Sequence, residues 1–398
     1  MNTKKKRNKI GIIILAIILT ALAAVAAVAV YTISFHKPDN DYDEVVFSTN
    51  GLDETENPDE TNAQNSSDET NSDETQPPED EKDEMFNFLI LGRDRVALNT
   101  DVIMLMNYNV TTKKISIMQI PRDTYILIDK MGYKLNGVYG RYYNEGISNK
   151  EKDPEDYGIN KLKSLLEQNL CVKIHYYAMV NLNGFRNIVD ILDGVEVDIP
   201  ADMYYVDKDQ GLTISLKKGK QTLNGEKAEM FVRYRSGWVQ ADIGRMDAQK
   251  IFMSALLKKV KNSINATNVV KLTNEVFKNV KTDVDLSDMA YFGKNLLDVD
   301  MEKMTFMSAP GAAPTPPANC GWYFVINRKG TLNLINEHFN IYNFEITDSI
   351  FDANKIFSGN KYATYLTPYY NAEPENVTGG NQQSAEDINQ GGITIPKV

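Results

Sequence analysis

The sequence has few of the residues and motifs on which many enzyme mechanisms depend. Its 398 residues include two cysteines, Cys171 and Cys320, which are far apart and do not have the spacing of a zinc site. Outside a cell they form a disulfide, or they remain two buried thiols. The three histidines, His36, His175 and His338, have neither metal-ligand nor catalytic-triad spacing. No Walker phosphate loop and no Gly-x-Ser-x-Gly nucleophile elbow is present, which argues against P-loop and elbow-type serine enzymes.

Charge is unevenly distributed along the chain. The formal net charge is −11, but Pro38 to Glu84 alone contains 18 acidic residues and one lysine, roughly −17. The first nine residues are basic, with Lys4, Lys5, Lys6, Arg7 and Lys9. The remainder is close to neutral, so bulk charge does not favour nucleic-acid binding.

A long uncharged run follows the basic N-terminus. Residues 10–33, from Ile10 to Ile33, are about 24 residues long and could cross a hydrocarbon core of roughly 30 Å. The basic residues 1–9 before it place the N-terminus in the cytoplasm and the rest outside. The alternative is a cleaved signal peptide with a site at Ala24–Ala26. We favour an uncleaved transmembrane helix, because the run is longer than a signal-peptide core.

Residues 34–85 then form an acidic linker with few large apolar side chains after Phe47. Such a segment cannot bury enough surface to offset chain entropy, so we predict a disordered tether.

Alternating apolar segments predict one α/β domain at residues 86–308, a three-layer α/β/α sandwich. The expected strands are Phe86–Leu91, Val102–Tyr108, Lys114–Ile120, Tyr176–Val180 and Val195–Ile199, and the expected helices are Ile159–Gln168 and Asn183–Leu192. Residues 309–369 begin with a proline-rich loop, contain one short helix at Leu332–Phe339, and have no assigned role. Residues 370–398 are polar and predict a disordered tail.

Two arginines lie two positions apart in Phe231–Arg235, among the β-formers Phe231, Val232 and Tyr234. On a strand this spacing puts Arg233 and Arg235 on one face. The apolar neighbours indicate that the strand is half buried, where an arginine needs an anionic partner.

A helix is predicted directly afterwards, from Arg245 to Lys259, with Asp242 as its N-cap. Arg245 and Gln249 are four residues apart and therefore share a helical face. Its core face is marked by Met246, Met253, Leu257 and Val260. The strand end and the helix start would aim three arginines and an amide at one place, which suits phosphate oxygens. The alternative is surface arginines paired with local carboxylates, but Asp242 and Asp247 cannot neutralise all three.

Two aspartates flank the first predicted loop. Asp94 and Asp101 each adjoin a buried strand, and paired carboxylates at strand ends can hold Mg²⁺ while leaving room for substrate phosphates. The alternative is that Asp101 caps a turn and Asp94 pairs with a nearby arginine. Arg122 follows the third strand and Lys134 comes soon after, and such a set of charges is typical of phosphoryl transfer.

These segments resemble the LytR–CpsA–Psr family of cell-wall ligases. The resemblance covers roughly Phe86 to Val260 and rests on Asn87–Asp94, Thr100–Leu105, Ile120–Tyr125, Lys134–Asn136, Gly194–Pro200, Leu223–Ala228 and Arg233–Gln249. It departs from the family at Asn99, where arginine is frequent, and at Gly137, where histidine is frequent.

The resemblance implies a sandwich around a mixed sheet that holds a polyprenyl pyrophosphate lipid, from which glycopolymers of the teichoic acid or capsule type are moved to peptidoglycan. By position, Asp94 and Asp101 would bind Mg²⁺ or Mn²⁺ and, with Arg122, take part in catalysis. The residues expected at the pyrophosphate are Arg95, Arg122, Lys134, Arg233, Arg235, Arg245 and Gln249.

Three functions are therefore compared. The first is a membrane-anchored glycopolymer phosphotransferase in the cell membrane with its C-terminal domain outside. The second is a non-catalytic lipid-phosphate-binding regulator of the envelope, and the third is a pyrophosphatase that acts on the same lipid with water. The two-aspartate metal site favours an enzyme, because simple anion binding does not require Asp94 and Asp101.

Overall fold

A computed structural model describes most of the chain beyond the linker. The described residues are Pro38 and 83–93, 98–129, 131–207, 212–234, 248, 251–256, 258–260, 262, 278–296, 298–299, 304–318, 320–351, 363–376 and 383–384. The predicted span at 10–33 and nearly all of the linker lie outside this set, as do Asp94, Arg95, Arg235, Asp242, Arg245 and Gln249. Within the set, no helix has the length and apolar character needed to cross a bilayer.

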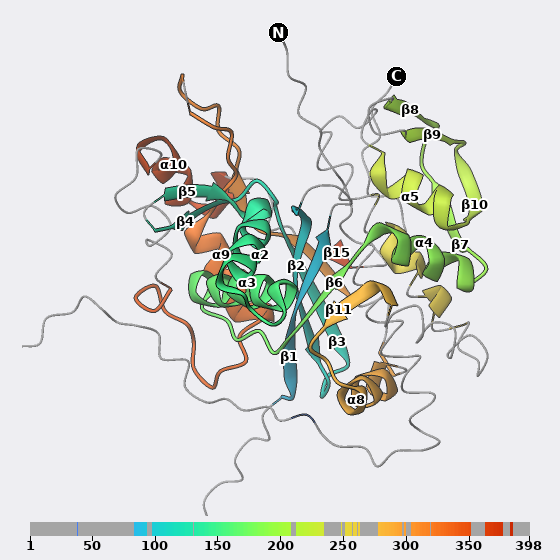
Figure 1. Cartoon of the computed structure of the whole chain (residues 1–398), viewed down its shortest axis with the longest axis horizontal. Helices are drawn as coiled ribbons and strands as arrows, with labels where there is room; N and C mark the ends of the chain where they lie inside the picture. The colour runs from blue at the N-terminus through green and yellow to red at the C-terminus, as the bar shows by residue number, and fades with distance from the viewer. Residues whose placement is uncertain are drawn as a thin grey trace, which may run out of the picture.

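A mixed seven-stranded sheet forms the centre of the molecule (Figure 1). Its spatial order is β11 (Val280–Thr282), β6 (Tyr176–Val180), β1 (Met85–Arg93), β2 (Thr100–Asn109), β3 (Lys114–Ile120), β12 (Thr305–Ser308) and β15 (Gln383–Ser384). The β1–β6 and β3–β12 pairs are parallel, and the other pairs are antiparallel. The strand at Gln383–Ser384 lies within the segment for which we predict a disordered tail.

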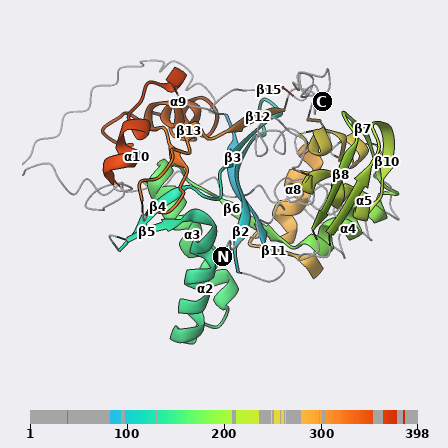
Figure 2. The ribbon, with the colours of Figure 1, turned by 90° about the horizontal axis from the view of Figure 1, so that it is seen from above.

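The sheet is covered on both faces, which explains the near-continuous apolar sequence of its central strands. Side chains alternate along β1, so that Phe88 and Ile90 join one hydrophobic cluster while Leu89 and Leu91 join another. All four side chains are fully buried. Figure 2 shows the two covering layers on either side of the sheet.

The first covering layer combines helices with two strand ribbons. Its helices are α4 (Leu182–Ile191), α5 (Gly225–Arg233), α8 (Leu286–Leu296) and helical residues 251–256 and 258–260. Its ribbons are β7 (Val195–Ile199) with β10 (Gly219–Leu223), and β8 (Met203–Asp207) with β9 (Leu212–Leu216). Asn181 caps α4 by accepting from the Gly184 N–H at 3.0 Å, and Gly194, with φ +81°, lies in the turn that ends it.

The second covering layer contains the helices α2 (Val138–Asn149), α3 (Pro154–Leu170), α9 (Arg328–His338) and α10 (Ala363–Tyr370). A hairpin of β4 (Tyr125–Ile128) and β5 (Met131–Lys134) lies beside them and leads through a 3-10 turn at Leu135–Gly137 into α2. The short pair β13 (Gly311–Ala312) and β14 (Val325–Ile326) completes this layer. Residues after 309 therefore share a core with α2 and α3.

The structure confirms the mixed α/β fold and its central mixed sheet. The strands predicted at Phe86–Leu91, Val102–Tyr108 and Lys114–Ile120 are present, as are the helices predicted at Ile159–Gln168 and Leu332–Phe339. The described part of the helix predicted at Arg245–Lys259 is also helical, with Met253 and Val260 buried.

The strand predicted at Phe231–Arg235 is wrong. Helix α5 continues to Arg233, and Tyr234 is extended. Asn224 caps this helix by accepting from the Lys227 N–H at 2.9 Å, and Ala228, Phe231 and Val232 then lie on one buried face. Helical packing therefore overrides the β propensity of the aromatic and branched residues.

The two cysteines do not form a disulfide with each other. Cys171 is buried at the C-terminal end of α3, and Cys320 is half-buried. Of the two alternatives, the structure therefore shows two separate thiols, although Cys320 is not fully buried.

Candidate functional site

Three strand ends meet at one edge of the sheet. Strand β1 ends where β2 begins, with Arg93 opposite Thr100, and Ile120 at the end of β3 lies opposite Ile103 of β2. Antiparallel pairing thus brings the segments after β1, before β2 and after β3 to the same edge. Asp101 and Arg122 both lie here.

Asp101 and Arg122 form a buried ion pair. The Arg122 Nη1 donates to Asp101 Oδ1 at 2.5 Å, and only 2% of the Asp101 side chain and 13% of the Arg122 side chain are exposed. Buried charges are tolerated when they are paired and hydrogen-bonded, and this pair holds the guanidinium at the edge of the sheet.

The β4–β5 hairpin brings Lys134 to the same region. The Asn136 N–H donates to the Arg122 carbonyl at 3.0 Å, and the Leu135 N–H donates to the Thr124 carbonyl at 2.9 Å. Lys134 Nζ then donates to Asp123 Oδ1 at 2.8 Å, in a pair whose side chains are about one-quarter exposed. Two cations, Arg122 and Lys134, therefore lie close together in the chain's described part, each with a carboxylate partner.

A further pair lies where β1 meets α3. Arg93 Nη1 donates to Glu155 Oε1 at 2.7 Å, and both side chains are 34% exposed. Burial, and then the Glu155 charge, raise the pKa of nearby Tyr139 to about 12, so this phenol stays protonated. Glu155 is not recognisable from the sequence, because a lone acidic residue in the first turn of a helix resembles a capping residue.

Arg233 lies on α5, in the first covering layer, on the face of the sheet opposite to α2 and α3. Its Nη1 donates to Glu229 Oε1 at 2.5 Å, and Glu229, only 1% exposed, also accepts from Arg186. One partner of Arg233 is thus a carboxylate one helical turn earlier. Asp242 and Asp247 lie outside the described residues. Two arginines, Arg186 and Arg233, thus contact the same carboxylate.

The predicted metal site is only partly within the described structure. Asp101 is buried at the strand edge, whereas Asp94 lies outside the described residues. In the ranges that the structure describes, no group of three or more acidic, histidine or cysteine side chains is arranged to hold a metal. Asp94 directly follows Arg93 in the sequence, however. Arg93 lies opposite Thr100 in the β1–β2 register, and Thr100 directly precedes Asp101.

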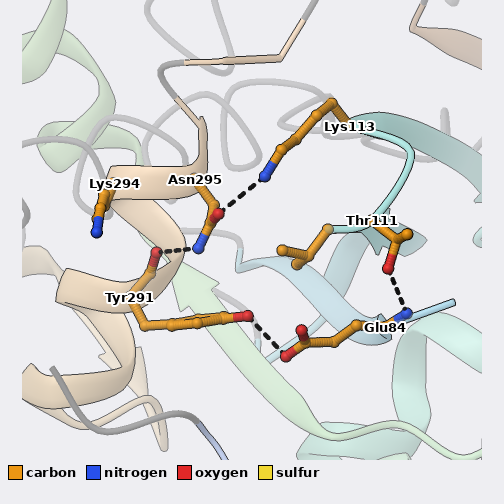
Figure 3. A pocket seen from close by; sticks show the side chains of 7 residues that line it. Glu84, Thr111, Lys113, Tyr291, Lys294 and Asn295 are labelled. Atoms are coloured by element: carbon orange, nitrogen blue, oxygen red, sulfur yellow. Dashed lines mark hydrogen bonds between the residues drawn. The ribbon is translucent and has the colours of Figure 1, made fainter. Parts of the chain in front are cut away.

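A polar cavity of about 440 Å³ lies at the other end of the sheet (Figure 3). Its described lining includes Lys113, Lys294, Asn295, Tyr291 and Glu84. Lys113 donates to Asn295 at 2.8 Å, and Tyr291 donates to Glu84 at 2.6 Å. The cavity adjoins the start of β1, about 26 Å along the strand from its end. We take the Asp101–Arg122 edge as the candidate site, because arginine and carboxylate groups converge there.

Comparison with known proteins identifies the family. Residues 46–340 match the LytR_cpsA_psr family. The chain belongs to the LytR_cpsA_psr family. This confirms the resemblance carried by the segments from Asn87 to Gln249.

Relatives of known name are similar over part of their length. TagV of Bacillus subtilis, named a polyisoprenyl-teichoic acid–peptidoglycan teichoic acid transferase, is 25% identical over 255 residues, or 62% of this chain and 61% of TagV. TagU of Oceanobacillus iheyensis, with the same description, is 27% identical over 67% of this chain and 76% of TagU. The regulatory protein MsrR of Staphylococcus aureus is 31% identical over 48% of this chain and 53% of MsrR. The matches thus span about half to three-quarters of these relatives.

Solved structures share the fold. B. subtilis TagV superposes with a TM-score of 0.51 at 22% identity, covering 64% of this chain and 95% of the TagV structure. A structure of TagT bound to LIIa-WTA superposes with a TM-score of 0.50 at 23% identity, covering 66% of this chain and 92% of TagT. At these identities the likeness shows the fold alone.

Proposed function

We propose that this protein is a membrane-anchored phosphotransferase that attaches a glycopolymer, carried on a polyprenyl pyrophosphate, to peptidoglycan. The observation that carries the proposal is the buried Asp101–Arg122 pair at the edge where three strand ends meet. The names of TagV and TagU supply the polymer class, teichoic acid, and the acceptor. A capsule-type polymer carried on the same polyprenyl pyrophosphate would present the same reacting phosphorus as a teichoic acid.

Arg122 and Lys134 would bind the pyrophosphate. A guanidinium presents five N–H donors in a planar fork, so one arginine can contact a carboxylate and phosphate oxygens at the same time. Asp101 fixes the guanidinium before substrate arrives, which lowers the ordering cost of binding. Arg95, Arg233, Arg235, Arg245 and Gln249 remain proposed pyrophosphate ligands, and Glu229 holds the Arg233 guanidinium in place through an ion pair.

Mg²⁺ or Mn²⁺ is the proposed cofactor, held by Asp94 and Asp101. Hard carboxylate oxygens suit either ion, and the Asp101 side chain is shielded from bulk water, which strengthens its electrostatic interactions. The bound ion would supply charge neutralisation to the pyrophosphate oxygens. Arg122 would then share Asp101 with the ion, which a single carboxylate with two oxygens permits.

In the proposed reaction, a hydroxyl of the peptidoglycan sugar attacks the phosphorus that carries the glycan. The new O–P bond joins glycan phosphate to peptidoglycan, and the bridging P–O bond of the pyrophosphate breaks. Polyprenyl monophosphate leaves with the bonding electron pair, and the hydroxyl proton is released. Arg122 and Lys134 would hold the phosphoryl oxygens and align them for displacement.

The Asp101→Asn variant tests this proposal. The substitution is nearly isosteric and removes negative charge beside Arg122, so binding of a polyprenyl pyrophosphate should persist. Transfer should fall at least about 100-fold, because the ion loses a carboxylate and Arg122 loses its anchor. The control is Asp202→Asn, an exposed carboxylate paired with Lys217. The assay supplies lipid-linked glycan, peptidoglycan fragments and Mg²⁺ and measures the covalent conjugate.

Two results would contradict the mechanism. One is full transfer by a folded Asp101→Asn variant, and the other is unchanged transfer by the wild type after chelation of divalent ions. The name of MsrR favours a second candidate, a lipid-phosphate-binding regulator. That function predicts lipid binding by the wild type with no conjugate under any condition.

A further inference from the structure

The segment after residue 309, for which the sequence predicts no role, is hydrogen-bonded to the segment that follows Arg122. The Phe324 N–H donates to the Asp123 carbonyl at 2.9 Å, and the Tyr125 N–H donates to the Phe324 carbonyl at 2.8 Å. The Asp123 side chain accepts from Lys134 Nζ at 2.8 Å. One residue of the candidate site therefore contacts the C-terminal segment through its backbone and Lys134 through its carboxylate.

Tyr323, which directly precedes Phe324, places its ring beside the Lys134 ammonium. Lys134 Nζ lies over this ring, 5.9 Å from its centroid. An ammonium within about 6 Å of the face of a tyrosine ring is attracted by the negative charge on that face. Lys134 therefore has two neighbours that favour its positive charge, the Asp123 carboxylate and the Tyr323 ring.

The Tyr323 ring is itself supported by a buried tyrosine. It packs edge-to-face on Tyr125, with 5.1 Å between the centroids and 88° between the ring planes. Tyr125 is 1% exposed and lies opposite Lys134 in the β4–β5 register, so both side chains are on one face of the hairpin. Gly132 leaves room for the Tyr125 ring, because a Cβ at this position would overlap it. The ring beside Lys134 therefore rests on a base that tertiary packing fixes.

The backbone on either side of Tyr323 is fixed as well. Before it, the Gly321 carbonyl accepts from the Tyr365 hydroxyl of α10 at 2.9 Å. After it, Val325 and Ile326 are buried in the hydrophobic cluster shared with α2 and α3. The position of the ring is thus set by the fold, and little conformational entropy is left to lose there when a ligand binds.

A flexible lysine needs such support to bind a phosphate group at a defined place. Its ammonium is carried on a mobile four-carbon stem that loses rotamer freedom when it is held. The pair with Asp123 restricts it only weakly, because both side chains are about one-quarter exposed and solvent screens such pairs. A carboxylate also accepts particular N–H donors, whereas a ring face attracts the charge as a whole. Tyr323 can therefore hold the ammonium while its N–H groups turn toward an anion.

We propose that Tyr323 is a positioning residue of the pyrophosphate site, which holds the Lys134 ammonium where it meets the phosphate oxygens. The inference rests on the proposed function, in which Lys134 binds the pyrophosphate, and it gives the C-terminal segment a part in substrate binding. Tyr323 acts through Lys134 and not on the reacting phosphorus. Its contribution should therefore appear in the affinity for pyrophosphate and disappear when the lysine is removed.

Binding of geranylgeranyl pyrophosphate to the full chain tests this assignment. Tyr323→Leu removes the ring, and Tyr323→Phe retains it. A trifluorinated phenylalanine at the same position retains the ring shape but withdraws negative charge from its face. Tyr369→Leu is the matched control, because Tyr369 lies on α10 in the same covering layer and is 40% exposed. Lys134→Met, alone and combined with Tyr323→Leu, completes a double-mutant cycle.

Tyr323→Leu should weaken binding roughly 3- to 10-fold, a loss between those of exposed and desolvated cation–π contacts. The trifluorinated ring should cause a similar loss, Tyr323→Phe should retain most of the affinity, and Tyr369→Leu should equal the wild type. In the Lys134→Met background, Tyr323→Leu should cause less than about a twofold further loss, because the ammonium that it positions is absent.

Other outcomes overturn the inference. If Tyr323→Leu binds like the wild type while Lys134→Met binds weakly, Tyr323 has no positioning role although the proposed function stands. An equal loss in the wild-type and Lys134→Met backgrounds, or full affinity with the trifluorinated ring, would show that Tyr323 acts by packing and not through the ammonium.

Two further results separate this inference from the proposed function. Normal binding by Lys134→Met would remove the lysine from the pyrophosphate site and the role of Tyr323 with it. A wild type that binds no pyrophosphate would overturn the proposed function itself. Circular dichroism checks the folding of each variant. If Tyr323→Leu does not fold, the trifluorinated ring compared with Tyr323→Phe decides, because these two side chains differ little in shape.

Discussion

Replacing Arg122 by methionine should destabilise the protein more than any loss of a surface ion pair. The substitution keeps a long flexible side chain but removes the cation from Asp101, of whose side chain only 2% is exposed. Removing one member of a buried ion pair typically costs about 3–5 kcal/mol. With a urea m-value of about 3 kcal/mol/M, the unfolding midpoint should fall by about 1 to 2 M.

Two companion variants make this measurement specific. Lys217→Met breaks the pair with Asp202, whose two side chains are 83% and 59% exposed, and should leave the midpoint unchanged. The double variant Asp101→Leu with Arg122→Met removes both charges and should recover much of the lost stability. Urea titrations followed by circular dichroism give all the midpoints. A loss below about 1 kcal/mol for Arg122→Met, or a double variant as unstable as the single one, would refute the reasoning.

Two further predictions concern pH and topology. Burial, followed by the charges of Lys173 and Lys163, lowers the pKa of His175 to about 4, so the unfolded state takes up a proton before the folded state as the pH falls. The free energy of unfolding should therefore drop by about 3 kcal/mol between pH 6.5 and pH 4 because of this group, and His175→Gln should remove that part of the slope in urea titrations. If residues 10–33 anchor an external domain, protease added to wall-stripped cells should digest the chain from Phe86 onward, and a protected domain would contradict the proposed location.

The central strands could be predicted because their burial on both faces is visible in the sequence. Strands β1 to β3 are rich in apolar residues that face both sides of the sheet. Such runs indicate strands covered on both faces rather than strands with one face in solvent. Their order along the chain then brings Asp101 and Arg122 to one edge. The sequence did not reveal that these two residues pair directly, since that depends on side-chain geometry across two strands.

Helix α5 and helix α2 show why local patterns fail elsewhere. Residues Phe231–Tyr234 contain β-formers, but propensity is a weak preference that the buried face of α5 overrides. Helix α2 contains two glycines, and it packs closely against α3 and against the loop between β1 and β2. A Cβ on Gly140 would lie 2.6 Å from the Leu98 carbonyl oxygen, and one on Gly158 would lie 3.0 Å from the Tyr143 nitrogen. Such contacts depend on tertiary structure and are not visible in the sequence.

The buried Asn87, near the start of β1, connects the central sheet to the C-terminal segment. Its side chain donates to the Phe339 carbonyl at the end of α9 at 2.8 Å and accepts from Asn107 of β2 at 2.9 Å. A buried amide that loses a partner typically costs about 1–3 kcal/mol, so the first part of β1 is stabilised by a carbonyl group of the C-terminal segment. Asn327, fully buried at the start of the same helix, donates in turn to the Ala372 carbonyl at 2.7 Å. Because α9 is tied to the sheet at one end and to the following segment at the other, the C-terminal segment belongs to the same cooperative core as the strands that position Asp101.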